Sequence, residues 1–378
     1  MSVPAEQKAG MRALILVGGF GTRLRPLTFT MPKPMVPFCN KPMIIHQVEA
    51  LKEVGVTEVI LAVAYQPEAM MESLKEWSEK LGVTFLFSHE KEPLGTAGPL
   101  ALAAPMLLKD DLPFFVLNSD VTCKFPFREL LAFHKQHGGE GTIMVTKVQD
   151  PTKYGVVMYD VKNGQIEQFV EKPKNFVGDK INSGIYVFNK SILNRIKVEK
   201  TSIETQVFPQ MASAKQLYCM ELEGFWMDIG QPHDYIDGIS KFLPSLSGTA
   251  REGELTSEAQ AKERGFEVVG CVMIHPTATV GANCILGPNV TIGANCRIGA
   301  CCRFVNTAIL ESTTVGTGTF ISKSIVGWRN TVGKWCRLES HVVTGDDVSI
   351  RAELHLNGVK VLPNKGVNQS YDKPEIVM

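Results

Sequence analysis

The sequence predicts an α/β domain with a mixed, mostly parallel sheet, followed by a left-handed parallel β-helix of hexapeptide repeats. Three observations predict this fold class. Short apolar runs alternate with helical patterns from Met11 to about Phe242, a polar stretch follows, and an apolar residue recurs every six residues from Ile274. Alternating strands and helices form largely parallel sheets with helices on both faces, and hexad repeats stack into coils.

The first domain is expected over residues 11–242. Ligands of such sheets bind beyond the carboxyl ends of the strands, so we expect a site where the glycines after Val17 and the polar residues after Leu117 lie. Strands are predicted at Ala13–Val17, Val59–Ala64, Val83–Phe87, Phe114–Leu117 and Thr142–Val148, and helices at Met43–Val54, Glu68–Leu81, Thr96–Leu107 and Glu129–His137.

A linker is predicted over residues 243–268, because this stretch is rich in Ser, Gly, Glu and Lys and contains few apolar residues. Residues 257–264 within it contain enough good helix formers for one short helix.

The second domain is expected over residues 269–378, where each hexad forms one face of a triangular coil with its aliphatic residue inside. Three hexads per coil give about four to five coils. Small residues four places after the aliphatic ones fill the corners, and we expect the six cysteines of this part to be small buried residues: Cys271, Cys284, Cys296, Cys301, Cys302 and Cys336. The apolar residues that head the hexads are first Ile274, Val280, Leu286, Ile292, Ile298, Phe304 and Leu310. The frame then slips by one residue to Val315 and Ile321, slips again to Val326, Val332 and Leu338, and resumes after an insertion at Val348 and Leu354.

Composition limits the partners and the compartment. The 39 basic and 39 acidic residues balance, so no long-range field attracts nucleic acid or an anionic membrane. No run approaches the roughly 18 apolar residues of a membrane span, and the first ten residues contain no apolar stretch typical of a secretion signal. Nine cysteines without C-x-x-C spacing disfavour a disulfide framework and a thiolate zinc site. These features predict a cytoplasmic protein without nucleic-acid or membrane partners.

A glycine-rich anion cradle is predicted directly after the first strand. The chain runs from this strand into Gly18-Gly19-Phe20-Gly21-Thr22-Arg23, and Lys33-Pro34 follows ten residues later. Glycines let backbone N–H groups close on a polyphosphate, an arginine grips phosphate oxygens bidentately, and a lysine adds a point charge. The spacing matches neither the dinucleotide fingerprint nor the P-loop, so the sequence disfavours both of these phosphate-binding classes.

The chain resembles the sugar-1-phosphate nucleotidyltransferases. The resemblance is carried by the glycine-rich cradle with Lys33-Pro34, and matching family positions follow at Glu171-Lys172-Pro173 and at Asp228 in Trp226-Met227-Asp228-Ile229-Gly230. It covers nearly the whole chain. The repeats make the chain most similar to members that use GTP and mannose 1-phosphate. The resemblance implies a Rossmann-like catalytic domain, Mg²⁺ as cofactor, and transfer of the guanylyl group of GTP to mannose 1-phosphate, giving GDP-mannose and pyrophosphate. It assigns catalysis to Arg23, Lys33 and Lys172, nucleotide binding to Leu16, Gly18, Gly19, Gly21, Thr22, Arg23, Glu90, Gly95, Thr96 and Asn118, sugar-phosphate binding to Glu171, Lys172, Asn182 and Gly184, and metal binding to Asp120 and Asp228.

The residue types suit this reaction. A sugar phosphate carries about −1.5 to −2 charge at pH 7, so it needs no general base, and the obstacle is repulsion between anions. Catalysis then consists of positioning and charge neutralisation by cations and backbone N–H groups. Magnesium prefers one or two carboxylates plus phosphate oxygens, which Asp120 and Asp228 can complete.

Substrate selection is expected from a few polar side chains. A carboxylate at Glu90 can accept two parallel hydrogen bonds from guanine, Gly95 permits close approach of the base, and Thr96 can cap the helix that follows. Lys172 is expected to neutralise the sugar phosphate, while Glu171 and Asn182 bind hexose hydroxyls.

Two alternatives stay open: the same chemistry with UTP or ATP and glucose 1-phosphate, and a non-catalytic homologue that regulates a partner enzyme. The intact set of glycines, cations and aspartates disfavours the second. The β-helices of acyltransferases use a histidine base, but His275, His341 and His355 are expected to be structural. Because the ends of a β-helix expose backbone groups, we expect a homo-oligomer that assembles through this domain.

Overall fold

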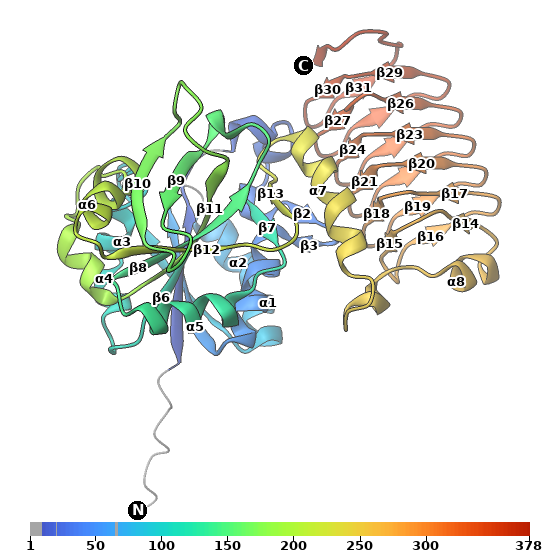
Figure 1. Cartoon of the computed structure of the whole chain (residues 1–378). Coiled ribbons are helices and arrows are strands. Elements are labelled where there is room, and N and C mark those ends of the chain that lie inside the picture. Colours follow the sequence, from blue (N-terminus) through green and yellow to red (C-terminus); the bar gives the residue numbers. More distant parts are fainter. Residues whose placement is uncertain (1–9, 20, 65–66) are drawn as a thin grey trace, which may run out of the picture. The chain divides into compact units, whose positions relative to one another are not determined.

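The computed structural model describes residues 10–19, 21–64 and 67–378 of the chain. By their contacts these residues form two compact units: residues 10–19 with Ile44–Trp226, and residues 21–43 with Met227–Met378. Figure 1 shows the elements of both units. The chain passes from one unit to the other inside the glycine-rich cradle, because Gly18 and Gly19 belong to the first unit and Gly21 to the second.

The first unit contains a nine-stranded mixed sheet with strand order β10-β9-β11-β6-β1-β4-β5, where β8 also pairs with β11 and β12 with β8 (Figure 1). The strands β6, β1, β4 and β5 are mutually parallel, and β11 is antiparallel to β6, which confirms the mixed, mostly parallel sheet. Its strands are β1 (Met11–Val17), β4 (Val56–Val63), β5 (Thr84–His89), β6 (Phe114–Asn118), β8 (Gly141–Lys147), β9 (Gly155–Tyr159), β10 (Ile166–Glu171), β11 (Lys180–Phe188) and β12 (Leu217–Glu221), and the short strand β7 (Val121–Cys123) lies outside this sheet.

The helices of the first unit confirm three of the four predicted helices. They are α1 (Met43–Glu53, of which Met43 belongs to the second unit), α2 (Pro67–Leu81), α3 (Gly98–Leu102), α4 (Ala104–Leu107), α5 (Phe127–His137) and α6 (Phe208–Ser213), with short 3-10 turns at Pro151–Lys153 and Lys190–Arg195 and a π-helix, η6, at Ile203–Val207. The single helix predicted at Thr96–Leu107 is wrong. The chain forms two short helices there, because Pro99 and Pro105 each occupy a first helical turn, where a missing N–H costs nothing.

The second unit contains a β-helix of three parallel sheets, consistent with the predicted left-handed hexad fold (Figure 1). The first sheet has β14 (Glu267–Val268), β17 (Ile285–Leu286), β20 (Arg303–Val305), β23 (Phe320–Ser322), β26 (Arg337–Glu339) and β29 (His355–Asn357). The second has β15 (Val272–Ile274), β18 (Val290–Ile292), β21 (Thr307–Ile309), β24 (Ile325–Val326), β27 (Val343–Thr344), β30 (Lys360–Val361) and β32 (Ile376–Val377), and the third has β16 (Thr279–Val280), β19 (Arg297–Ile298), β22 (Thr314–Val315), β25 (Thr331–Val332), β28 (Ser349–Ile350) and β31 (Gly366–Val367).

Other elements of the second unit precede this β-helix. They are a hairpin of β2 (Pro37–Phe38) and β3 (Lys41–Pro42), the 3-10 turns η1 (Thr22–Leu24), η2 (Leu27–Phe29), η3 (Lys33–Met35) and η7 (Glu252–Glu254), and the helices α7 (Pro232–Ser245) and α8 (Glu258–Glu263), while β13 (Trp226–Asp228) spans the junction of the units. The short helix predicted at 257–264 is confirmed as α8. Ser257 begins it with a capping box, in which its hydroxyl accepts from the Gln260 N–H and the Gln260 side chain accepts from the Ser257 N–H.

The repeat frame differs from the prediction in three respects. Ile309, which pairs with Ile292, is the interior residue, so the first slip falls before Ile309 and not after Leu310. Val332 pairs with Ile350, and Leu338 pairs with Leu356. The heads of the last hexads are therefore Ile350 and Leu356, and not Val348 and Leu354 as predicted. Each sheet has six or seven strands, which gives more than the predicted four to five coils. A slip shortens a coil from 18 to 17 residues without changing which side chains face inward.

The interior of the β-helix explains four of its cysteines. Cys284, Cys296, Cys302 and Cys336 are at most 2% exposed, as predicted, and each lies two residues before an interior apolar residue. Two cysteines differ: Cys301 is exposed and Cys271 is half-buried. Cys301 lies at a coil corner with φ +57°, where its side chain is exposed. Its neighbour Cys302 is buried, so a difference of one position in the repeat decides whether a cysteine faces solvent or the interior.

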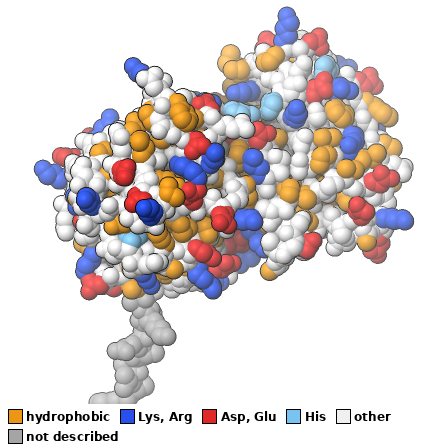
Figure 2. All heavy atoms as spheres, viewed as in Figure 1, with side chains coloured by type: hydrophobic (Ala, Val, Ile, Leu, Met, Phe, Trp, Pro, Cys, Tyr) orange, Lys and Arg blue, Asp and Glu red, His pale blue; other side chains and the backbone are white. Residues whose placement is uncertain are grey.

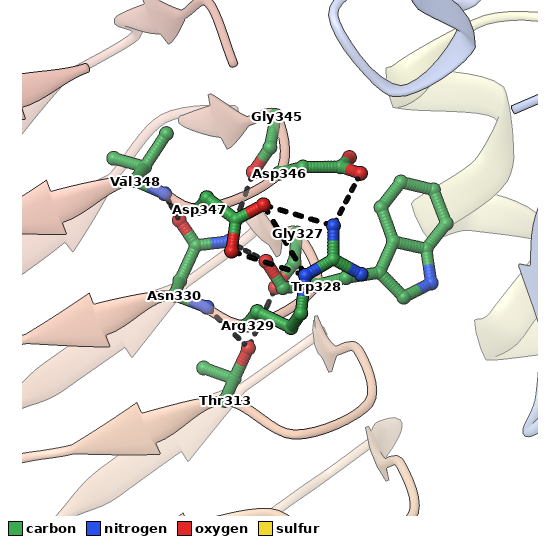
Figure 3. A network of polar contacts seen from close by, with 9 residues as sticks. All are labelled: Thr313, Gly327, Trp328, Arg329, Asn330, Gly345, Asp346, Asp347 and Val348. Atoms are coloured by element: carbon green, nitrogen blue, oxygen red, sulfur yellow. Dashed lines mark hydrogen bonds and ion pairs between the residues drawn. The ribbon is translucent and has the colours of Figure 1, made fainter. Parts of the chain in front are cut away.

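Asn330 connects three successive coils inside the β-helix (Figure 3). Its Nδ2 donates to Trp328 O at 3.1 Å and to Gly345 O at 2.9 Å, and its Oδ1 accepts from Val348 N at 3.0 Å. Its own backbone N–H donates to Thr313 Oγ1 at 3.2 Å. Because each polar atom of this buried amide has a partner, the cost of its desolvation is offset.

The distribution of charge on the surface and the character of the helices agree with the expectations from composition. Figure 2 shows side chains of both charge signs intermixed on the displayed face. Within residues 10–19, 21–64 and 67–378, no helix combines the length and the apolar character that crossing a bilayer requires.

Candidate active site

The carboxyl ends of β1 and β6 bring two of the predicted segments together in the first unit. Leu16 pairs with Asn118, and Ser119 N donates to Leu16 O at 3.3 Å. The glycine turn after β1 and the turn that carries Asp120 therefore leave the same edge of the sheet, as expected. Gly19 has φ +98°, a conformation that side chains disfavour, which explains one glycine of the cradle.

The sugar-phosphate residues lie on β10, β11 and the turn between them, also in the first unit. Gly184 has φ +77°, and a Cβ there would lie 2.6 Å from Asn118 Nδ2, so only glycine permits this approach. Gly184 N donates to Asn182 Oδ1 at 3.0 Å, and Asn182 Nδ2 donates to Tyr186 Oη at 2.8 Å. Predicted nucleotide and sugar residues thus meet at Asn118 and Gly184.

The predicted phosphate cation Lys172 follows β10 with φ +43°, and its Nζ lies 3.1 Å from Glu171 Oε1. The Lys172 side chain is largely exposed, so this pair contributes little to stability. An ion pair this weak does not prevent Lys172 from pairing with another anion.

The predicted base-reading residues follow β5. Glu90 is 5% exposed, and its Oε2 accepts from Leu94 N at 2.9 Å, which fixes the turn toward Gly95. Gly95 has φ +76°, and a Cβ there would lie 2.5 Å from Thr201 O. The local structure therefore requires glycine at this position whatever ligand it meets.

The predicted capping role of Thr96 is wrong. The residue that begins α3 is Ala97, without a side-chain cap. Thr96 Oγ1 instead donates to Glu204 Oε2 at 2.6 Å and accepts from Ile203 N at 2.9 Å, so it connects the loop to the π-helix η6. This contact spans more than 100 residues, which is why local sequence could not predict it.

The cationic half of the cradle lies in the second unit, around Gly230. A Cβ at Gly230 would lie 2.7 Å from Asp228 Oδ1, 2.8 Å from Lys33 Nζ and 3.3 Å from Arg23 Nη2. Arg23 Nη2 lies 4.0 Å from Asp228 Oδ2, and Asp228 Oδ1 accepts from Gly230 N at 2.9 Å. The structure thus brings Arg23 and Lys33, two cations predicted to bind phosphate, close to the predicted metal ligand Asp228, although about 200 residues separate this ligand from the cations in the sequence.

Gly21 and Thr22 precede this cluster. Gly21 begins η1 with φ +60°, and Thr28 Oγ1 donates to its carbonyl at 2.7 Å. A Cβ at Gly21 would lie 3.1 Å from Lys33 Cβ, so the glycine lets the two ends of the loop approach. Thr22 is exposed at the first position of η1.

A metal would be held here by few protein ligands. Among residues 10–19, 21–64 and 67–378, no group of three or more His, Cys, Asp or Glu side chains is placed to hold an ion. Magnesium is typically bound by one or two carboxylates, with waters and substrate phosphates as its other ligands, so the carboxylate of Asp228 beside the side chains of Arg23 and Lys33 fits this chemistry.

Two residues that the sequence analysis did not single out position the site. Gln47, fully buried on α1, donates from Nε2 to Asn118 O at 2.8 Å and to Val121 O at 3.0 Å, and so brackets Asp120. Trp226 Nε1 donates to Ser183 O at 3.0 Å, between two predicted sugar residues. A buried amide on an otherwise apolar helix face was the available signal for Gln47. The tryptophan gave none.

Comparisons with known proteins place the chain in a family. A family model described as nucleotidyl transferase matches residues 12–244, and one described as the GMPPB C-terminal domain matches residues 268–377. The chain is 55% identical over 368 residues to the mannose-1-phosphate guanylyltransferase catalytic subunit beta of Dictyostelium discoideum, covering 97% of this chain and 100% of that one. It is 54% identical over 369 residues to the mannose-1-phosphate guanyltransferase of Hypocrea jecorina, with the same coverage.

A solved structure of HddC from Yersinia pseudotuberculosis is 28% identical with a TM-score of 0.52, and the match covers 61% of this chain and 99% of that chain. A putative glucose-1-phosphate thymidylyltransferase from Bacillus anthracis, at 24% identity and a TM-score of 0.53, shows likeness in fold alone over 59% of this chain and 91% of that chain. Because one family model covers more than half of the chain and the relatives match nearly all of it, the chain belongs to the nucleotidyl transferase family and carries the GMPPB C-terminal domain.

Proposed function

We propose that this chain transfers the guanylyl group of GTP to mannose 1-phosphate and releases pyrophosphate. Relatives at 54–55% identity over 97% of the chain are named for this activity. The observation that carries the proposal is the cluster of Arg23, Lys33 and Asp228 around Gly230, because two cations and a carboxylate are what a polyphosphate and its metal require.

The proposed reaction is an in-line displacement at the α-phosphorus of GTP. A phosphate oxygen of mannose 1-phosphate forms the new P–O bond, the bond to the β-phosphate oxygen breaks, and pyrophosphate leaves with that electron pair. Arg23 and Lys33 offset the charge of the triphosphate, and Lys172 offsets that of the sugar phosphate. No proton has to be removed from the nucleophile, so the reaction needs no histidine or thiolate.

Mg²⁺ is the proposed cofactor, with Asp120 and Asp228 as its protein ligands. When bound, it supplies positive charge at the phosphate oxygens. Asp228 retains a fixed orientation for this role, because its Oδ1 accepts from Gly230 N.

The remaining assignments concern substrate choice. Leu16, Gly18, Gly19, Gly21, Thr22 and Asn118 are proposed to line the nucleotide with their backbone and amide groups, and Glu90, Gly95 and Thr96 to surround the base. Glu171, Asn182 and Gly184 are proposed to bind the hexose. Asn118, at the end of β6, adjoins Gly184, which supports a continuous nucleotide and sugar surface within the first unit.

The proposal extends to organisation and compartment. Residues 11–242 would carry catalysis, 243–268 would link, and 269–378 would assemble a homo-oligomer by covering open β-helix ends. All nine cysteines have free thiols, which is compatible with the reducing cytoplasm.

Pyrophosphate release tests the activity. The full-length protein would be assayed with GTP, UTP and ATP, each against mannose 1-phosphate and glucose 1-phosphate. We expect the highest kcat/KM for GTP with mannose 1-phosphate. A higher value for UTP or ATP with glucose 1-phosphate would replace the proposed substrates, and no release with any pair would support a non-catalytic homologue.

A further inference from the structure

The hairpin β2–β3 contains a strained turn that packs inside the second unit. Phe38 pairs with Lys41, so Cys39 and Asn40 form a two-residue loop, and their φ angles are +48° and +65°. Two successive positive φ angles define a type I′ turn, in which Asn and Gly are common and Cys is not. Cys39 is 1% exposed. A buried non-glycine residue keeps this conformation only where its surroundings impose it.

A coil of the β-helix holds the tip of this hairpin. Asn40 Nδ2 donates to Ile292 O at 3.0 Å, although 252 residues separate the two. The same carbonyl accepts from His275 N at 2.9 Å as part of the contact between coils. The hairpin thus uses the second acceptor site of a carbonyl that the β-helix already fixes.

The second strand of the hairpin is held by charge. Lys41 Nζ lies 3.4 Å from Glu254 Oε1 in η7, and Arg251 donates to both oxygens of Glu254 at 2.8 and 3.0 Å. The pKa of Glu254 lies below its usual value, since hydrogen bonds and charge from Arg251 and Lys41 outweigh the largest single effect, the desolvation that raises it. A bidentate arginine contact makes this more than a loose surface pair.

The first strand is held by aromatic packing. Phe38 is fully buried, with its ring centroid 5.3 Å from that of Tyr235 and 5.4 Å from that of Phe242, both edge-on. Tyr235 Oη also donates to Pro37 O. Both aromatic residues lie on α7, the helix that begins four residues after Asp228.

The hairpin continues the segment that carries the cationic half of the candidate site. Val36 N donates to Lys33 O at 3.1 Å, and Met43 N donates to Val36 O at 3.1 Å, so Lys33 is connected to both strands by short backbone links. A displacement of the hairpin therefore moves Lys33 relative to Asp228 and Arg23.

We propose that the C-terminal β-helix acts in catalysis within its own chain, with Asn40 as a positioning residue that fixes Lys33 relative to Arg23 and Asp228 through the β2–β3 hairpin. The catalytic part of this inference rests on the proposed function. The positioning part does not, because it concerns the order of residues 21–43 in the protein without substrate.

Asn40→Gly in the full-length protein tests the inference. Glycine suits a type I′ turn, so the variant removes the amide without new backbone strain. Asn295→Gly is the matched control, because Asn295 also has positive φ but is exposed at a coil corner. Hydrogen exchange of residues 21–43 should become about fivefold faster in Asn40→Gly, the change expected for one lost hydrogen bond, and stay unchanged in Asn295→Gly.

Function and assembly are measured on the same samples. Asn40→Gly should lower kcat with GTP and mannose 1-phosphate by about fivefold or more, as a shifted cation requires, with the mass from light scattering unchanged. Glu254→Gln should also make the hydrogen exchange of residues 21–43 faster and lower kcat, whereas its control Glu263→Gln, at an exposed position, should change neither. Unchanged exchange of residues 21–43 in both Asn40→Gly and Glu254→Gln would overturn the inference, as would faster exchange with normal kcat. An inactive wild-type protein would refute the proposed function, while the exchange result would still decide the positioning.

Discussion

Replacement of Gly230 by alanine probes the cationic cluster directly. Gly230 has an ordinary backbone conformation, so alanine adds only a Cβ. That atom would lie 2.7 Å from Asp228 Oδ1 and 2.8 Å from Lys33 Nζ, whereas ordinary contact begins at 3.4 Å, so each group must retreat by about 0.6 Å or more. The arrangement of the predicted phosphate and metal groups changes, but no backbone has to move.

The expected loss is in activity and not in stability. A misplacement of about 1 Å at reacting groups can reduce rates about 100-fold, so we expect kcat/KM for GTP to fall by about 10- to 100-fold in Gly230→Ala. The displaced atoms are the ends of flexible side chains, so the melting temperature should change by no more than about 2 °C. Pyrophosphate release and calorimetry measure the two quantities.

Gly366→Ala provides the control, since Gly366 has no atom within 4 Å of the added Cβ and an ordinary backbone conformation. It should match the wild type in both assays. If Gly230→Ala retained full kcat/KM, the convergence of Arg23, Lys33 and Asp228 would have no catalytic meaning. If it lost activity only together with several degrees of melting temperature, Gly230 would be structural.

Four further outcomes are expected. Asp228→Asn keeps the acceptor for Gly230 N but removes the charge that magnesium needs, so turnover should fall about 100-fold or more with little change in stability, and near-normal turnover at saturating magnesium would remove Asp228 from the metal site. Glu90→Gln should keep the bond from Leu94 N yet lower the efficiency with GTP by about 1–3 kcal/mol, and equal losses with GTP and UTP would contradict base reading. Burial, and then the charge of His134, lower the pKa of His137 to about 4, so the folded state binds a proton less readily than the unfolded state. The free energy of unfolding should therefore fall by about 1–2 kcal/mol as the pH falls from 6.5 toward 4, after allowance for partial exposure. A melting temperature that is constant over this pH range would contradict this expectation. Light scattering of the full-length protein should show a dimer or a tetramer, and a monomer would refute the assembly role.

The neutral state of His137 is also required by its hydrogen bonds. His134 Nδ1 and His137 Nε2 both contact Thr142 Oγ1, at 2.8 and 2.7 Å, and a single hydroxyl can donate to one ring and accept from the other. Gly139 N donates to His137 Nδ1 at 2.9 Å, which leaves that nitrogen no proton. Protonation of His137 at acidic pH therefore breaks the Gly139 contact, in agreement with the predicted sign.

Local pattern predicted most of the sheet because buried strands such as β1 and β6 are continuous apolar runs. It missed β9 to β12. β10 and β12 mix buried with exposed residues, β9 has only three consecutive buried residues, and the polar run Asn182-Ser183-Gly184 interrupts the apolar pattern of β11. The split of the helix at Thr96–Leu107 was readable from Pro99 and Pro105. In the β-helix, the period was clear, but a slip by one residue leaves an aliphatic residue at both candidate positions, as at Ile309 and Leu310, and only the pairing register decides between them.

The candidate site was predictable as a set of residue types and not as an arrangement. Arg23, Lys33 and Asp228 followed from the resemblance, yet nothing local indicates that they surround Gly230. Gln47 and Trp226 act through hydrogen bonds to backbone carbonyls 71 and 43 residues away, and such bonds leave no mark on the neighbouring sequence. The contact of Asn40 with Ile292 is hidden for the same reason.

The most direct test of the central claim is the stoichiometry of products made by the purified full-length protein. With GTP, mannose 1-phosphate and magnesium, mass spectrometry should find one GDP-mannose for each pyrophosphate released, and Asp228→Asn should lose both products together. Pyrophosphate release without GDP-mannose, or equal yields from the wild type and Asp228→Asn, would contradict guanylyl transfer at this site.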